Sequence, residues 1–135
     1  MEMTFKKIFA LSLVIAVHFK IATTLYAQSL KGQRLTDSLQ HSLLTAKEDT
    51  NKIKTLYRLA WAYTINDSAT AFNYANKCLS LSKKINWQKG VGLSYSAMAS
   101  ALYNVSNFNT SIQYSTAAYN IFKSINSKKD IGAAL

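Results

Sequence analysis

Residues 71–92, AFNYANKCLSLSKKINWQKGVG, lie over residues 111–132, SIQYSTAAYNIFKSINSKKDIG, when the chain is shifted by 40 positions. The two stretches agree in side-chain size and polarity more than in identity, and packing depends on size. The segments just upstream of each stretch also match, with one residue less between them. A repeat of this length is typical of stacked arrays of helix pairs.

The composition favours an all-helical chain. The 135 residues include no proline and only four glycines, so the main helix breakers are almost absent. Few runs alternate between apolar and polar residues, as strands would. This length suits one modest domain or part of a larger array. We therefore expect an all-α fold, an α-α superhelix built from antiparallel helix hairpins.

The net charge of +10 does not by itself indicate nucleic-acid binding. The first 27 residues hold three lysines and one glutamate, so the remainder carries 13 basic and 5 acidic residues, a net charge of +8. In that part only Lys83-Lys84 and Lys128-Lys129 are adjacent basic pairs. A nucleic-acid footprint needs its basic residues on one face, whereas scattered lysines are typical of solvated helix ends.

The motifs of common catalytic sites are missing from the sequence. It contains no Gly-rich phosphate loop, no Gly-x-Ser-x-Gly and no His-Glu-x-x-His. The lone Cys78 excludes an internal disulfide and a cysteine-based metal cluster. His41 falls on the polar side of its helix without partners and receives no role. We expect neither an enzyme, nor a cofactor, nor a metal site within these residues.

Residues 1–27 have the pattern of a secretory signal. Lys6 and Lys7 form a basic start, residues 8–19 are mainly apolar, and mostly small residues lead to Ala27. The alternative is an uncleaved N-terminal anchor, because His18 and Lys20 interrupt the apolar run. Both interpretations predict an exported protein that is periplasmic or attached to the membrane and facing the periplasm.

The rest of the chain divides into a connecting part and an array. Residues 28–48 are expected to form a linker (28–33) and a short capping helix (35–47). Residues 49–135 are expected to form the array, with units at about 49–86 and 87–126 and the start of a third at 127–135. The expected helices cover about 50–65, 67–85, 88–103, 108–125 and 128–135. The last helix begins without a closing polar face, which favours a fragment or self-association through this open helix.

Capping and small residues support these boundaries. Asp49 is a good N-cap, Asp67 or Ser68 caps the next helix, and Asn107 caps the fourth. Small side chains on the second helix of each unit allow close helix approach. Cys78 is one of them and is expected to be a buried small hydrophobe.

These residues resemble the tetratricopeptide repeat. The first unit supplies Leu56, Leu59, Ala60 and Tyr63, followed by Ala71, Ala75 and Cys78. The second supplies Tyr95, Met98, Ala99 and Leu102, followed by Phe108, Ser111, Ser115 and Ala118. The family's first tryptophan and closing proline are missing, and the repeat is about 40 residues long instead of 34. The longer form is similar to the repeats of kinesin light chains and of exported sensor regions in bacterial signalling proteins.

The resemblance implies a non-catalytic scaffold that binds a protein or peptide segment in a concave groove. The family's groove positions fall on eight residues: Lys54, Tyr57, Trp61, Thr64, Leu93, Ser96, Ser100 and Tyr103. The alternative role for Trp61 is to cover the neighbouring unit. A sensor region of a bacterial signal-transduction protein is the favoured function. The alternatives are the N-terminal fragment of a sensor histidine kinase with its catalytic part beyond residue 135 and, least favoured, a basic nucleic-acid-binding module.

Overall fold

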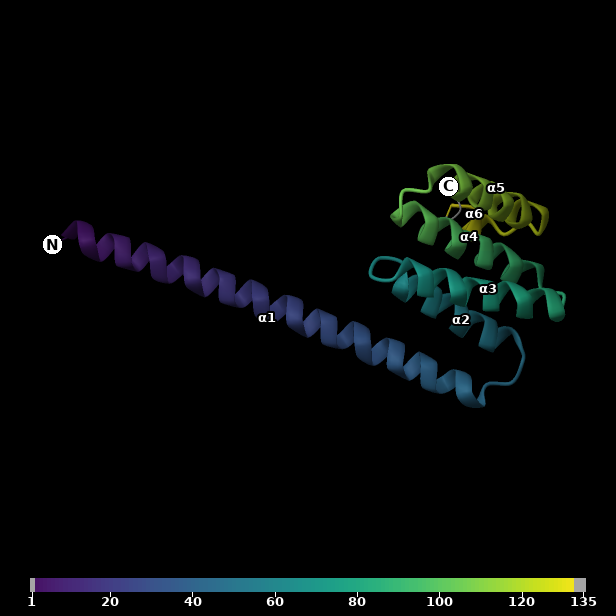
Figure 1. The fold of residues 1–135 in the computed structure, drawn as a ribbon, viewed down its shortest axis with the longest axis horizontal. Coiled ribbons are helices and arrows are strands. Elements are labelled where there is room, and N and C mark those ends of the chain that lie inside the picture. Colours follow the sequence, from purple (N-terminus) through teal and green to yellow (C-terminus); the bar gives the residue numbers. More distant parts are fainter. Residues whose placement is uncertain (1, 133–135) are drawn as a thin grey trace. The chain divides into compact units, whose positions relative to one another are not determined.

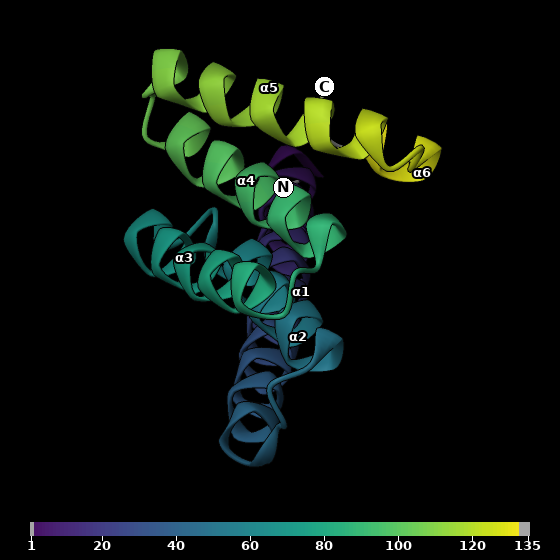
Figure 2. The ribbon, with the colours of Figure 1, turned by 90° about the vertical axis from the view of Figure 1, so that its right-hand side faces the viewer.

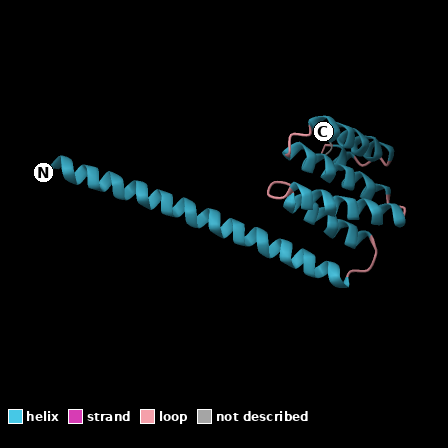
Figure 3. Ribbon diagram, viewed as in Figure 1, coloured by secondary structure: helices cyan, strands magenta, loops and turns pink. Residues whose placement is uncertain are grey.

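The structure, a computed structural model, describes residues 2–132, and the side chains of residues 13–132. The described part contains the helices α1 (Glu2–Thr45), α2 (Thr50–Tyr63), α3 (Ser68–Lys84), α4 (Gln88–Asn104), α5 (Phe108–Ser124) and α6 (Lys128–Ile131). Figure 3 shows these helices joined by loops, with no strand among residues 2–132. The predicted all-α class is confirmed, and the end of the last expected helix, residues 133–135, lies outside the described residues.

The chain separates into two units, residues 1–35 and residues 36–135. In the first unit the side chains from Leu13 to Leu35 are exposed. From Leu13 to Thr45, α1 is long and apolar enough to cross a membrane. A signal sequence near the N-terminus passes the same test of length and composition, so the signal and the anchor both stay predictions.

The expected linker at residues 28–33 is helical, because α1 continues through it to Thr45, and its role as a linker stays a prediction. This stretch has no proline, and its single glycine, Gly32, costs a helix only about 1 kcal/mol. The capping helix expected at 35–47 is therefore the end of α1. Within the second unit, Leu39 of this end is buried, and Gln40 donates hydrogen bonds to the hydroxyls of Tyr63 and Tyr74, both at 3.1 Å.

In the second unit each helix packs on the next, from α2 to α6, and α2 also contacts α4 (Figures 1 and 2). The helices α3, α4, α5 and α6 begin at residues 68, 88, 108 and 128, an interval of 20 residues. Two such intervals make the 40-residue shift seen in the sequence. The 40-residue repeat is thus present in the spacing of the helices as well as in the side chains.

The helices α3, α4 and α5 end in the same way. A residue in the left-handed region follows each helix: Asn86, Ser106 and Asn126, with φ of 54°, 60° and 53°. The N–H of the next residue donates to the carbonyl five positions back, at 2.8 to 2.9 Å. This arrangement, the Schellman motif, satisfies carbonyls that the helix end leaves free.

The turn between α2 and α3 is different. It contains no residue with positive φ, and the N–H of Asp67 donates to the carbonyl of Tyr63 at 2.8 Å. The two helices begin only 18 residues apart, at Thr50 and Ser68. The expected end of α2 at residue 65 is two residues too late, since α2 ends at Tyr63.

Two of the three predicted N-caps are confirmed by their hydrogen bonds. The Asp49 carboxylate accepts from the N–H groups of Asn51 and Lys52 at 2.8 and 3.0 Å, and Asp67 accepts from Thr70 at 2.9 Å. Asn107 occupies the N-cap position of α5, but its side chain makes no capping bond. Its φ of −86° differs from the −134° of Asp49 and the −152° of Asp67.

The core lies between successive helices and includes six residues of the predicted repeat pattern: Leu56, Ala60, Ala75, Cys78, Met98 and Ala118. Its three clusters centre on Ile53, Leu56, Cys78 and Leu81; on Ala60, Ala75, Ala97 and Met98; and on Leu93, Ala118 and Phe122. The prediction for Cys78 is confirmed, because its side chain is fully buried and its thiol donates to the Ile53 carbonyl at 3.6 Å. Burial raises the pKa of this thiol, which keeps it in the unreactive protonated form.

Candidate binding groove

The eight predicted groove residues come from α2, α4 and the residue after α2, and they differ in exposure. Three are exposed: Lys54, Trp61 and Tyr103. Two are half-buried: Tyr57 and Ser100. The other three are buried: Thr64, Leu93 and Ser96. Because α2 and α4 are in contact, residues of both helices can line one surface.

Four of the eight residues line one hollow of about 210 Å³: Trp61, Ser96, Ser100 and Tyr103. Ala99 of α4 and two serines of α5, Ser111 and Ser115, complete its wall. The hollow therefore combines two large aromatic side chains with serine hydroxyls. The sequence placed Ser111 and Ser115 only on a helix-packing face, and their small size is what leaves this space open.

Trp61 is at once a packing residue and an accessible one. Its ring meets that of Tyr57 edge to face, with centroids 6.1 Å apart, and 40% of its surface stays exposed. Burial raises the pKa of the Tyr57 hydroxyl, so this group is neutral at physiological pH. An edge-to-face pair fixes the indole in place and leaves a large amphipathic surface for contact.

Tyr103 extends the aromatic surface to the end of α4. Its ring packs edge to face on Phe108 at 5.4 Å, and 62% of its surface is exposed. Next to it, Asn104 donates to the carbonyls of Thr64 and Ser100 at 3.0 and 3.1 Å. Asn104 thus ties the end of α2 to α4 beside the hollow, a bridging role that the sequence pattern did not reveal.

Two predicted groove residues point into the protein. The Thr64 hydroxyl donates to the Trp61 carbonyl at 2.8 Å and closes the end of α2. Leu93 packs in the core with Ala118 and Phe122. Of the eight predicted groove residues, the exposed ones are Lys54, Trp61 and Tyr103.

Nothing in the described side chains gathers metal-binding groups, since no three His, Cys, Asp or Glu residues of this part lie close enough to hold an ion. Comparisons with known protein families, with curated proteins and with solved structures find no match to this chain.

Proposed function

We propose that the second unit is a tetratricopeptide-like scaffold, and that it binds a protein or peptide segment in the groove along α2 and α4. The hollow that brings Trp61, Ser96, Ser100 and Tyr103 together is the observation that carries this proposal. Exposed tryptophan and tyrosine side chains are the residues that most often anchor protein partners. The half-buried Ser100 and Ser115 offer hydroxyls to a partner's backbone, whereas Ser111 already donates to the Ala99 carbonyl at 2.8 Å.

The arrangement of the helices supports the repeat assignment. In a stack of helix hairpins, each first helix packs on its own partner and on the first helix of the next unit. The contacts of α2 with both α3 and α4 follow this rule. The 20-residue interval between helix starts and the matched left-handed residues Asn86 and Asn126 also support a regular superhelix.

The cellular setting belongs to the same proposal. We place the scaffold outside the cytoplasmic membrane, as the sensing region of a bacterial signalling protein. The apolar helix from Leu13 to Thr45, with the basic Lys6 and Lys7 before it, supports export or anchoring. In this setting Lys54, exposed on α2, meets an acidic group of the partner.

The test is peptide selection against the full chain. Peptides selected from a displayed random library are compared on the native chain, on the double variant Trp61→Ala/Tyr103→Ala and on Ile112→Ala, an exposed control on α5. We expect the double variant to lose about 2 kcal/mol or more of binding free energy, as hot-spot aromatics do. Equal binding by all three chains would refute the groove assignment.

A further inference from the structure

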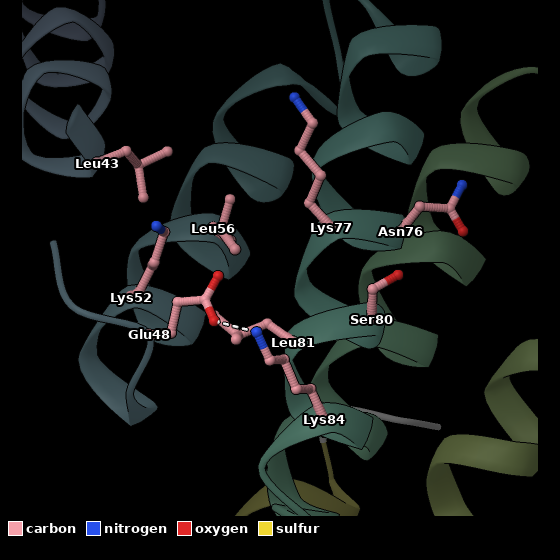
Figure 4. A pocket seen from close by; sticks show the side chains of 9 residues that line it. All are labelled: Leu43, Glu48, Lys52, Leu56, Asn76, Lys77, Ser80, Leu81 and Lys84. Carbon is pink, nitrogen blue, oxygen red and sulfur yellow. Dashed lines mark hydrogen bonds and ion pairs between the residues drawn. The ribbon is translucent and has the colours of Figure 1, made fainter.

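A second pocket lies away from the groove, within the second unit. It has a volume of about 490 Å³ and is formed by the end of α1, the α1–α2 loop, α2 and α3 (Figure 4). This volume falls within the range of about 300–1,000 Å³ that is usual for small-molecule sites. None of its residues belongs to the predicted groove.

Three leucines supply the apolar part of this pocket. Leu43 comes from α1, Leu56 from α2 and Leu81 from α3. Leu56 and Leu81 are buried members of the core, whereas Leu43 is half-buried and packs against that core. Three separate elements therefore give an aliphatic surface, suited to a hydrocarbon chain and without an aromatic ring in the wall.

The rim of the pocket is positively charged. It carries Lys52, Lys77 and Lys84 against a single acidic residue, Glu48. Glu48 and Lys84 form an ion pair, and Lys84 is the main cause that lowers the pKa of the Glu48 carboxyl, with a smaller effect from Lys52. The pair neutralises itself and leaves two positive charges, on Lys52 and Lys77.

Lys52 and Lys77 have weak partners. The Lys52 ammonium donates to the Ala46 carbonyl at 3.3 Å, and the Lys77 ammonium lies 5.3 Å from the centroid of the Tyr74 ring. Neither forms an ion pair with a carboxylate among the described side chains. Figure 4 shows Leu56 between these two lysines, so positive charge borders the aliphatic surface on both sides.

We propose that this pocket binds a small amphiphilic anion, a carboxylate with an unbranched aliphatic chain. The carboxylate lies at the rim, where Lys52 and Lys77 carry the unpaired positive charge, and the chain covers Leu43, Leu56 and Leu81. Charge complementarity favours an anion over a neutral or cationic amphiphile. Beside the polar Asn76 and Ser80, the apolar part of the wall is aliphatic, which favours an alkyl chain. Glu48 and Lys84, paired with each other, close one end of the site.

The test measures protection of a thiol introduced at the pocket. Ser80 is exposed and lines the pocket, and Lys83 is exposed without lining it, so Ser80→Cys is the probe and Lys83→Cys the control. The buried Cys78 contributes little reaction. The full chain in zwitterionic nanodiscs is labelled with a maleimide, with and without octanoate.

We expect octanoate to slow labelling of Ser80→Cys by about fivefold or more at several times its Kd, because protection grows as one plus the ratio of free ligand to Kd. Labelling of Lys83→Cys should stay unchanged. Octanol and octylammonium at the same concentration should protect clearly less. Equal protection by the three amphiphiles, or none by octanoate, would overturn the proposal.

The lysines are tested in the Ser80→Cys background. Replacing both as Lys52→Gln/Lys77→Gln should weaken octanoate binding about three- to tenfold, since each exposed charge pair is worth a few-fold. The matched variant Lys83→Gln should leave binding unchanged, and an equal effect of both would contradict the assigned contacts. Trp61→Ala/Tyr103→Ala should not alter protection, so the pocket and the peptide groove can fail independently.

Discussion

The hairpins α2–α3 and α4–α5 follow one 40-residue sequence pattern, but their helices are joined and capped differently. The first has a short helix of 14 residues, a turn without a left-handed residue, and aspartate side chains that cap both helices. The second has two helices of 17 residues, a left-handed turn at Ser106, and no side-chain cap. One packing scheme is thus compatible with two kinds of helix termination.

At two pairs of equivalent positions, one hairpin has a small residue where the other has a large one. Ser82 and Trp87 of the first unit correspond to Phe122 and Ser127 of the second, after the shift of 40. Ser82 and Phe122 are both fully buried, although their volumes differ greatly. Trp87 packs against the first and the third cluster, and we infer that it supplies the bulk that Ser82 lacks. The repeat therefore keeps the filled volume and not the residue at each position.

The largest effect that this exchange predicts is at Phe122. Phe122→Ala should lower the free energy of unfolding by about 3–5 kcal/mol, because it empties a fully buried ring site. Its counterpart, Ser82→Ala, should cost about 1 kcal/mol or less, since it loses only the hydrogen bond to the Cys78 carbonyl. Urea unfolding followed by tryptophan fluorescence reports on this unit, because both tryptophans, Trp61 and Trp87, lie in it.

If Phe122→Ala and Ser82→Ala lowered the free energy of unfolding by similar amounts, exchanged side-chain volumes would not explain how the two hairpins are packed. The same measurement on Trp87→Ala sharpens the result. If Trp87 replaces the bulk missing at Ser82, this variant should lose stability on the scale of Phe122→Ala.

Gly92 and Gly132 are the next pair, again 40 positions apart. A Cβ on Gly92 would lie 2.6 Å from the Phe122 ring, whereas one on Gly132 would meet nothing within 4 Å. Gly92→Ala should therefore cost about 1–2 kcal/mol, an overpacking cost of about 1–3 kcal/mol partly offset by better helix propensity. Gly132→Ala should be neutral or slightly stabilising, and equal effects in urea unfolding would contradict the close approach of α4 and α5.

The sequence predicted the regular parts of this fold well. Helix type and the burial of the small residues Ala71, Ala75, Cys78 and Ala118 follow from periodicity and residue size, which act locally. The helical state of residues 28–33 was not predicted, although nothing in this stretch breaks a helix. The exchange between Ser82 and Phe122 was also missed, since compensation between neighbours is visible only once the helices are packed.

The candidate sites were predictable to different degrees. The aromatic groove residues follow from their positions in the repeat, and four of the eight predicted residues do line one hollow. Which of them are accessible depends on the packing of α5 against α4, which turns Leu93 into a core residue. The second pocket depends on how the end of α1 and its loop meet α3, and no local pattern encodes that contact.

The difference in helix caps predicts a smaller effect. Asp49→Ala should cost about 1 kcal/mol, because two N–H groups of the first turn of α2 lose their acceptor. Asn107→Ala should change stability by less than about 0.5 kcal/mol, since its side chain makes no capping bond. Circular dichroism during urea unfolding measures both, and a larger loss at Asn107 would reverse the proposed difference between the hairpins.

The smallest effect concerns the ion pair of each hairpin with a neighbouring segment. Asp130 of α6 binds Lys89 of α4 at 2.7 Å, and its side chain is 15% exposed; Glu48 binds Lys84, and its side chain is 54% exposed. Burial by itself would raise the pKa of Asp130, but the bonds from Lys89 and Ser127 outweigh it and lower this pKa. The contribution of the Asp130 carboxylate to the free energy of unfolding is therefore fully present above the pKa of about 3.9 that it has in the unfolded chain. This contribution is lost as the pH falls through the lower pKa of Asp130 in the folded chain.

Asp130→Asn should cost about 0.5–1 kcal/mol at pH 7, and the loss of stability between pH 5 and pH 2 should be smaller in this variant than in the native chain. Glu48→Gln should change the unfolding midpoint less, because its more exposed pair is better screened by water and salt. Urea unfolding at pH 7, pH 5 and pH 2 measures the effects of both substitutions. If Glu48→Gln had the larger effect, the α1–α2 loop would be held more by charge than α6 is, and side-chain exposure would not determine which ion pair stabilises more.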